Sequence, residues 1–162
     1  MSEAVFATGP EELLDPETRQ SLSGLEVMQG ILEGRFPHPP ICKVLGFRLS
    51  DVAYGRVRFE GAPGFDVCNP HGTVHGGWYG TLLDSAMACA FLTTLSDRSG
   101  YTTLEYKVNI TRGIRLDTPV IAEGVVQHAG RRTGVATGKI VGTDNGRLYA
   151  TGSTTCIVLH PD

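Results

Sequence analysis

The chain has 162 residues, which is enough for one domain with a substantial core and too few for two ordinary domains. Hydrophobic residues make up 41% of the chain and charged residues 19%, as in ordinary globular proteins. The net charge is −3, and residues 1–40 hold the excess of acids, because the rest of the chain has twelve bases and ten acids. That balance excludes a nucleic-acid-binding protein, which would carry a dense basic face.

The cysteine pattern and the N-terminus indicate a cytoplasmic protein. The four cysteines form no CxxC pair, and widely spaced cysteines without a secretion signal are expected to stay reduced. The N-terminal segment is acidic and lacks the apolar stretch of a signal peptide. The apolar segment from Trp78 to Leu95 is long enough to suggest a membrane span, but Asp84 near the bilayer centre would cost about 2.5–3.5 kcal/mol. We therefore expect a buried helix and no contact with a membrane.

Residues 1–40 are expected to form a helical extension and a linker. We expect residues 1–14 to be disordered or loosely packed. One helix should begin after Asp15, a good N-cap residue followed by proline, and should end at Gly34. The prolines of FPHPP (36–40) exclude a helix there and indicate the linker. Our hypothesis is that this amphipathic helix covers the sheet or the edge of a dimer.

From Val44 onward, short strands surround one apolar helix. Two strands (46–52 and 55–61) precede a loop rich in proline and glycine (62–72), and a helix buried along one broad face occupies the apolar segment that starts at His75. Four more strands are expected after Gly100, at residues 102–110, 119–129, 134–143 and 147–159, with turns at 117–119, 130–134 and 144–146. This order predicts an α+β fold in which a curved antiparallel sheet wraps around one long helix.

The strand 102–110 alternates strictly between apolar and polar residues. The alternation predicts two faces. One face should carry Leu104, Tyr106, Val108 and Ile110, and the other Thr103, Glu105, Lys107 and Asn109.

Asp84 is the most informative residue of the chain. Between Glu60 and Asp97 the only charged residues are Asp66 and Asp84, and Asp84 lies inside the apolar helix. An ionised carboxylate is costly to bury without a partner, so Asp84 either bonds to a hidden structural partner or is a reactive group. Gly76 opens the same helix, where backbone N–H groups have no intrahelical acceptor and can donate to a developing oxyanion.

The spacing of these residues resembles a known family. Asn69 is followed after six residues by His75-Gly76-Gly77, and Asp84 follows His75 after nine. This set, with the strand TTLEYKVNITRG after the helix, resembles the hotdog-fold acyl-CoA thioesterases of the phenylacetic-acid-degradation (PaaI-like) type. The resemblance covers roughly residues 40–159, with residues 1–40 as an extension and 41–160 as the thioesterase domain. It departs at Gly113, where the family usually has proline, and this leaves the loop geometry open.

The resemblance implies a protein that hydrolyses an acyl-CoA to the free acid and CoA, without a metal or an organic cofactor. It implies a homodimer as the minimum unit, often a homotetramer, with each active site built across the dimer interface. Asp84 would act as general base or as nucleophile, and the Gly76 N–H would polarise the thioester carbonyl. Asn69 would orient the water or the carbonyl, His75 would brace the loop, and the Thr103 hydroxyl would hold the attacking water.

Thr102 is the alternative to Thr103 for that hydroxyl. The CoA phosphates need cations, and the candidates are Arg131 and Arg132 in the loop GRRTG and Arg112 after the strand, with Gly77 allowing close approach of the substrate. The threonine and the two loop arginines each have a purely structural explanation as well. A threonine in a strand needs no function beyond β propensity, and arginines at a hairpin tip are commonly just solvated.

Other readings of the same residues remain open. His71 and His75 have the spacing of a metal pair, but only on a helix, and the surrounding residues indicate a loop. Cys68 beside Asn69 is more simply a small apolar residue than a nucleophile. Three aromatic residues, Trp78, Tyr79 and Phe91, either belong to the core or line an acyl pocket, in which case they would suit a short or aryl acyl group. The alternative functions are an acyl-CoA-binding protein without catalysis, such as a sensor, and an acyl-thioester hydratase or dehydratase.

Overall fold

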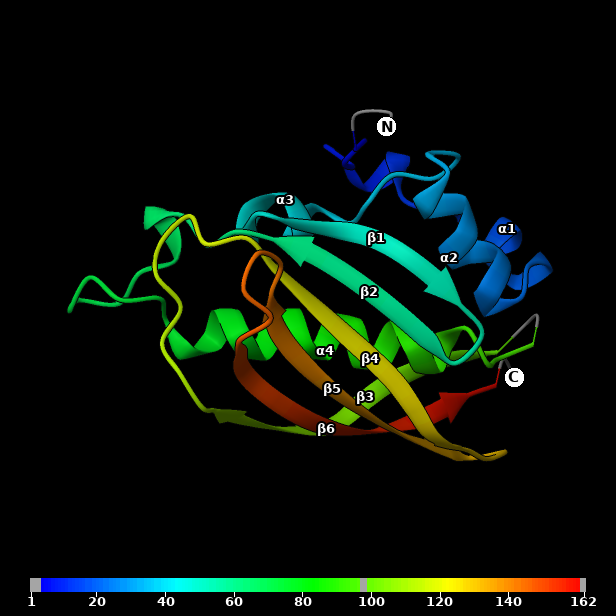
Figure 1. Cartoon of the computed structure of the whole chain (residues 1–162). Helices are drawn as coiled ribbons and strands as arrows, with labels where there is room; N and C mark the ends of the chain where they lie inside the picture. Colours follow the sequence, from blue (N-terminus) through cyan, green and yellow to red (C-terminus); the bar gives the residue numbers. More distant parts are fainter. Residues whose placement is uncertain (1–3, 97–98, 161–162) are drawn as a thin grey trace.

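A six-stranded antiparallel sheet curves around the long helix α4 (Gly76–Leu92) (Figure 1). The computed structural model describes residues 4–96 and 99–160. The strand order is β1-β2-β4-β5-β6-β3, and the strands are β1 (Phe47–Ala53), β2 (Arg56–Gly61), β3 (Gly100–Ile110), β4 (Val120–Ala129), β5 (Thr133–Gly142) and β6 (Leu148–Leu159). This confirms the α+β fold expected from the sequence, with all six strands and the central helix in place.

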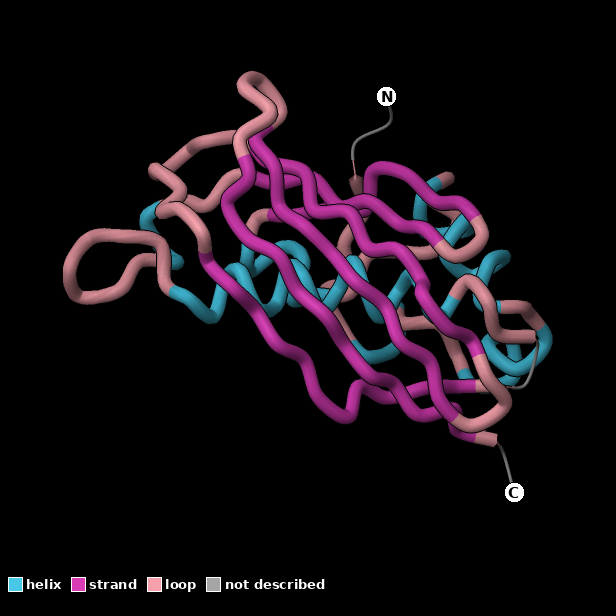
Figure 2. The backbone as a smooth tube through the Cα atoms, turned by 60° about the horizontal axis from the view of Figure 1, so that its bottom comes forward, coloured by secondary structure: helices cyan, strands magenta, loops and turns pink. Residues whose placement is uncertain are grey.

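Helix α4 is the centre of the core. It lies against the sheet (Figure 2) and packs against all six strands. Most of its residues are buried. Gly124 of β4 lets the helix backbone approach closely, because a β-carbon at this position would lie 2.2 Å from the carbonyl oxygen of Ala86. The less buried face of α4 carries Thr81, Asp84 and Ser85. None of the helices in the described part of the chain is long and apolar enough to cross a membrane.

The extension contains two helices where we expected one. They are α1 (Pro16–Ser21) and α2 (Gly24–Leu32). Leu22 has an extended backbone, and Ser23 begins α2 with a capping box, in which its side chain and that of Glu26 bond to each other's backbone N–H. A capping box starts a new helix, so the helical spacing across Leu22 did not produce a continuous one. The helix ends before Gly34, whose φ of 78° is left-handed, as expected for a glycine stop.

Phe6 and Ala7, in the segment before these helices, pack on the rest of the chain, so the expectation of a loosely packed arm is wrong there. Phe6 pairs with His38 as a β-bridge, and Ala7 is buried. His38 is also buried, and its Nε2 accepts a hydrogen bond of 3.1 Å from the N–H of Leu49 in the edge strand β1. The extension therefore covers the open edge of β1, which would otherwise expose unpaired backbone groups.

The linker is also shorter than we expected. Pro40 is the first residue of helix α3 (Pro40–Leu45), which the sequence analysis missed. Proline suits this position because the first helical N–H has no intrahelical acceptor. Helix α2 packs on β1, and the N–H of Gly24 bonds to the carbonyl of Leu95, so the extension also contacts the end of the central helix segment (Figure 1).

Candidate active site

Asp84 and Thr103 are brought together from α4 and β3. The Thr103 hydroxyl donates a hydrogen bond of 3.0 Å to Asp84 Oδ1. Asp84 is half-buried, and no ion pair to it is found among residues 4–96 and 99–160. Burial raises the pKa of the Asp84 carboxyl, and the bond from Thr103 lowers it in part, so that the pKa stays above its ordinary value. A carboxylate with a raised pKa is a better proton acceptor.

A β-bulge in β3 turns Thr103 toward the helix. Thr103 pairs with Cys156 of β6 and Glu105 with Thr155, so that Leu104 is an extra residue between them. Because one inserted residue reverses the alternation, Thr103 shares the inner face with Tyr106. The strict alternation that we expected, with Thr103 opposite Tyr106, is wrong for this reason. Thr102 is exposed, and within the described residues its side chain makes no hydrogen bond to Asp84.

The first turn of α4 is held by His75. His75 is the N-cap, and its Nδ1 accepts a hydrogen bond of 2.9 Å from the N–H of Gly77. Nδ1 must be unprotonated to accept, so in the neutral ring the proton is on Nε2. The N–H of Gly77 is therefore occupied, whereas the N–H of Gly76 has no acceptor in the part of the chain that the structure describes. Gly76 and Gly77 are both exposed.

Asn69 shapes the loop that leads to this helix. Its Oδ1 accepts hydrogen bonds from the N–H groups of His71 (2.9 Å) and Thr73 (3.2 Å), and its Nδ2 donates to the Thr73 hydroxyl (2.8 Å). The loop is closed by a bridge between Cys68 and Val74. These bonds lock the turn that delivers the chain to His75.

Asp84 and Gly76 are too far apart within one chain to act on the same carbonyl. They are eight residues apart on one helix, which corresponds to about 12 Å along its axis. A reacting carbonyl has to lie about 3 Å from both the oxyanion donor and the attacking group. One copy of the chain therefore contains both halves of such a site but cannot assemble them.

The three candidate arginines are exposed and do not lie together. The Arg112 N–H bonds to the carbonyl of Tyr149, near the start of β6, whereas the carbonyl of Arg132 accepts from the N–H of Val158, near its end. Nine residues of strand separate these two points, about 30 Å. Within one copy, Arg112 lies at the Gly76 end of α4, and Arg131 and Arg132 lie at the opposite end.

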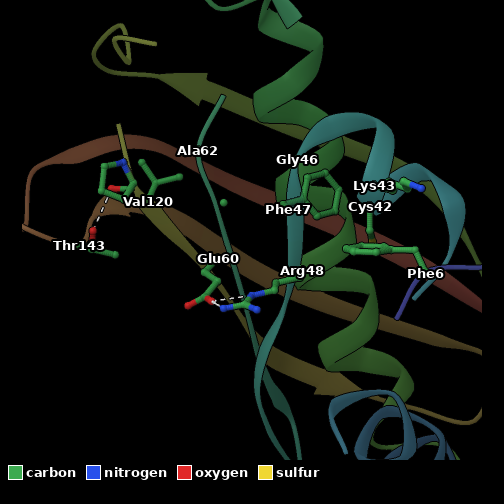
Figure 3. A pocket seen from close by; sticks show the side chains of 12 residues that line it. Phe6, Cys42, Lys43, Gly46, Phe47, Arg48, Glu60, Ala62, Val120 and Thr143 are labelled. Atoms are coloured by element: carbon green, nitrogen blue, oxygen red, sulfur yellow. Dashed lines mark hydrogen bonds and ion pairs between the residues drawn. The ribbon is translucent and has the colours of Figure 1, made fainter. Parts of the chain in front are cut away.

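Asp84 lines none of four cavities within residues 4–96 and 99–160. A cavity of about 310 Å³ lies at the start of α4, and six of its lining residues are Leu45, Cys68, His75, Gly77, Trp78 and Thr81. A larger one of about 510 Å³ lies between the N-terminal segment and the ends of β1, β2 and β4. Figure 3 shows Phe6 and Phe47 in its wall and Arg48 bonded to Glu60 at 2.8 Å. None of the candidate site residues lines this larger cavity.

All three aromatic residues considered for an acyl pocket belong to the core. Phe91 is fully buried, and the buried Tyr79 hydroxyl accepts a hydrogen bond of 2.8 Å from the N–H of Ile114. Trp78 is also buried and donates from Nε1 to the carbonyl of Leu45 (2.9 Å), but it borders the smaller cavity.

Gly80 and Tyr106 also lie at this site, although neither was expected there. A β-carbon on Gly80 would lie 3.2 Å from the ring and the hydroxyl of Tyr106, so the ring lies directly against the helix. The signal was present in the sequence, because Gly76, Gly80 and Asp84 are spaced by four residues and share one face of α4.

Comparisons with known proteins agree with this fold. The family model of the thioesterase superfamily matches residues 71–149. A thioesterase family protein from Silicibacter pomeroyi is 24% identical, with 85% of this chain and 99% of that chain covered and a TM-score of 0.73. The TT0310 protein from Thermus thermophilus is 30% identical, with 73% and 96% covered and a TM-score of 0.66. A mutant of the phenylacetic acid degradation protein PaaI from the same organism is 29% identical, with 73% and 97% covered and a TM-score of 0.66.

A comparison with curated protein sequences gave no match. The chain belongs to the thioesterase superfamily, and the proteins similar to it include members of the PaaI type.

Proposed function

We propose that this protein is an acyl-CoA thioesterase, which hydrolyses a thioester to a free carboxylic acid and CoA. The observation that carries the proposal is the pair of Asp84 and Thr103, two helical turns from the free N–H of Gly76, in a chain of the thioesterase superfamily. A protein of the same fold from Streptococcus mutans UA159, 22% identical, has been crystallised bound to acetyl CoA. This supports a CoA thioester as the ligand of this chain as well.

The active site is assembled between two copies of the chain. In a symmetric dimer with antiparallel α4 helices, Asp84 of each copy faces Gly76 of the other, which removes the separation of about 12 Å. The thioester carbonyl then accepts a hydrogen bond from the Gly76 N–H of one copy, which stabilises the developing oxyanion. Asp84 of the other copy takes a proton from the attacking water, or attacks the carbonyl itself. The C–S bond breaks, and the CoA thiolate leaves and takes up a proton. Attack by water gives the free acid directly, whereas attack by Asp84 gives a mixed anhydride, which water then hydrolyses to the free acid and the Asp84 carboxyl.

Strand β3 is the edge at which the copies meet. It is an edge of the sheet, and Leu104, Tyr106 and Ile110 on it are exposed by 58%, 46% and 48%. The outer face of the sheet, by contrast, has a continuous polar row across all six strands. In order, this row is Asp51, Arg58, Glu123, Lys139, Thr151 and Asn109. An edge with unpaired backbone groups and apolar side chains supports pairing with a second copy better than this charged face does.

The same arrangement would bring the separated arginines together. Arg112 follows Ile110, which lies beside Gly76, whereas the loop with Arg131 and Arg132 leads into Gly134, which contacts Phe91 near the other end of α4. When the two α4 helices are antiparallel, the Phe91 end of α4 in one copy lies near the Gly76 end of α4 in the other copy. Each site would then have Arg112 from one copy and the two loop arginines from the other to bind the CoA phosphates.

The remaining candidates support the site indirectly. In this proposal Asn69 and His75 hold the loop and the first helical turn that present the Gly76 N–H. Gly77 contributes space, because its own N–H is bonded to His75. We assign the site to a thioesterase domain of residues 41–160 and regard residues 1–40 as an extension. We also propose that the enzyme works in the cytoplasm, where its four free cysteines would stay reduced.

The test is release of free thiol from short, medium, long and aryl acyl-CoAs by the wild type and by Asp84→Asn. We expect turnover by the wild type and a loss of about a hundredfold or more in Asp84→Asn. Ser85→Ala, on the same half-buried face of α4, is the matched control and should keep its activity. A folded Asp84→Asn enzyme with full activity would refute the assignment. Saturable acyl-CoA binding without turnover would instead identify a non-catalytic acyl-CoA-binding protein.

A further inference from the structure

Three residues of α4, spaced one turn apart, each face a residue of β3. Asp84 accepts the hydrogen bond from Thr103 at 3.0 Å. A β-carbon on Gly80 would lie 3.2 Å from Tyr106, and one on Gly76 would lie 3.7 Å from the side chain of Ile110. The ring of Tyr106 therefore lies against α4 midway between the two halves of the proposed site. Its hydroxyl makes no hydrogen bond within residues 4–96 and 99–160 that would hold it in a purely structural role.

The symmetry of the proposed site determines where Tyr106 lies in the dimer. If Asp84 faces Gly76 of the other copy, then Gly76 faces Asp84 of the other copy, because the interface is the same on both sides. The residue midway between them is Gly80, which must face its own counterpart. The two-fold axis therefore passes close to Gly80, and the two Tyr106 rings, each packed on a Gly80, lie beside the axis between the two active sites.

The acyl group has no space within its own copy behind Asp84. Met87 and Phe91 follow Asp84 on α4, Cys156 pairs with Thr103, and all three are fully buried. Asp84 lines none of four cavities in the described part of the chain. The acyl group must then lie between the two copies, where the half-exposed ring of Tyr106 stands. One helical turn, about 6 Å, separates Gly80 from Asp84 along the helix axis.

We propose that the two Tyr106 rings form the partition between the two acyl sites and limit each site to short or single-ring acyl groups. This inference rests on the proposed function, since it takes the shared site as its starting point. Tyr106 is then a specificity-determining residue, and Gly80 is the residue that makes room for its ring. Removing the ring would open each site toward the axis and admit longer acyl groups.

The position at the axis is tested without any measurement of activity. A short bismaleimide reagent is added to Tyr106→Cys, and covalent dimers are counted on a denaturing gel. Tyr54→Cys is the matched control, because Tyr54 is also exposed but lies in the turn between β1 and β2, away from β3. The wild type shows the background from the native cysteines. We expect a covalent dimer for Tyr106→Cys only. Equal cross-linking of Tyr106→Cys and Tyr54→Cys would overturn the placement.

The role in specificity is tested by kcat/KM for long-chain and short-chain acyl-CoAs with Tyr106→Ala and Tyr106→Phe. We expect Tyr106→Ala to raise the ratio of long to short by about tenfold or more, because filling or emptying a pocket changes discrimination by this amount. Tyr106→Phe, which keeps the ring, should keep the wild-type ratio. An unchanged ratio in a dimeric Tyr106→Ala enzyme would overturn the partition. A wild type that hydrolyses no thioester would overturn the proposed function and the substrate limit with it, whereas the cross-link would still decide where Tyr106 lies.

Discussion

Replacing Thr103 by valine removes the single side-chain hydrogen bond that we find on Asp84 in the described structure, with little change of shape. A hydrogen bond to a charged group contributes about 1.5–3 kcal/mol. Asp84 is only half-buried, so water can replace part of this bond, and we expect the lower end of the range. At about 1.4 kcal/mol for each factor of ten, the loss corresponds to roughly tenfold lower kcat/KM at a pH where Asp84 is largely protonated in the variant.

The direction of the pH effect follows from the same bond. The Thr103 hydroxyl stabilises the ionised carboxylate, so its removal raises the pKa of Asp84 further above its ordinary value. A base works only when it is deprotonated, so the acidic limb of the pH–rate profile should move to higher pH, and the difference should shrink on the plateau. A raised pKa in the folded state also means that Asp84 favours folding when protonated, and that this contribution is lost as the pH rises through the folded pKa.

The assay is kcat/KM against pH for the wild type, Thr103→Val and Thr102→Val, with the melting temperature of each at neutral pH. Thr102 is the matched control, because it is the preceding residue of the same strand and is exposed. We expect the Thr102→Val profile to follow the wild type. If the Thr103→Val profile also superimposes on the wild type, the bond to Asp84 has no part in setting its protonation, and our reasoning about the site is wrong.

Three further predictions concern the scaffold. Gly124→Ala would place a β-carbon 2.2 Å from the α4 backbone. Overpacking of this kind costs about 1–3 kcal/mol, which lowers the melting temperature by about 2–12 °C. Gly113→Ala, whose β-carbon would have no atom within 4 Å, is the control, and equal melting temperatures of the two variants would contradict the close approach. Burial lowers the pKa of His38, whose neutral ring accepts a hydrogen bond from the Leu49 N–H. The contribution of His38 to stability is therefore present above its ordinary pKa of about 6.5 and is lost as the pH falls through the folded pKa. The melting temperature, measured from pH 8 to 5 at roughly half-unit intervals around that ordinary pKa, should fall less in His38→Gln than in the wild type, and parallel curves for the two proteins would count against this role of His38. Ser23→Ala removes the capping box of α2 and should cost about 1 kcal/mol in denaturant unfolding, whereas an unchanged midpoint would mean that the cap does not limit stability.

The sequence by itself determined the six strands, the central helix and the family. Asp144-Asn145-Gly146 and GRRTG mark their hairpins, the alternating strands and the apolar helix follow from residue periodicity, and the spacing of Asn69, His75 and Asp84 points to the thioesterases. These signals are local, because a turn, a cap or a period of residues is encoded within a few neighbouring positions. The break before α2 was local as well, since Ser23 and Glu26 form a capping box that can be recognised in the sequence.

Only the tertiary structure decided which side chains meet. The bulge at Leu104 depends on how β3 pairs with β6, about fifty residues later in the chain, and it alone turns Thr103 to Asp84. The contact of Tyr106 with Gly80 likewise depends on how β3 packs on α4. Strand register and helix packing are set by contacts between distant segments, and a shift of one residue reverses the face on which every later side chain lies. For that reason the sequence could nominate Asp84, but the fold had to supply its partner and the raised pKa of its carboxyl.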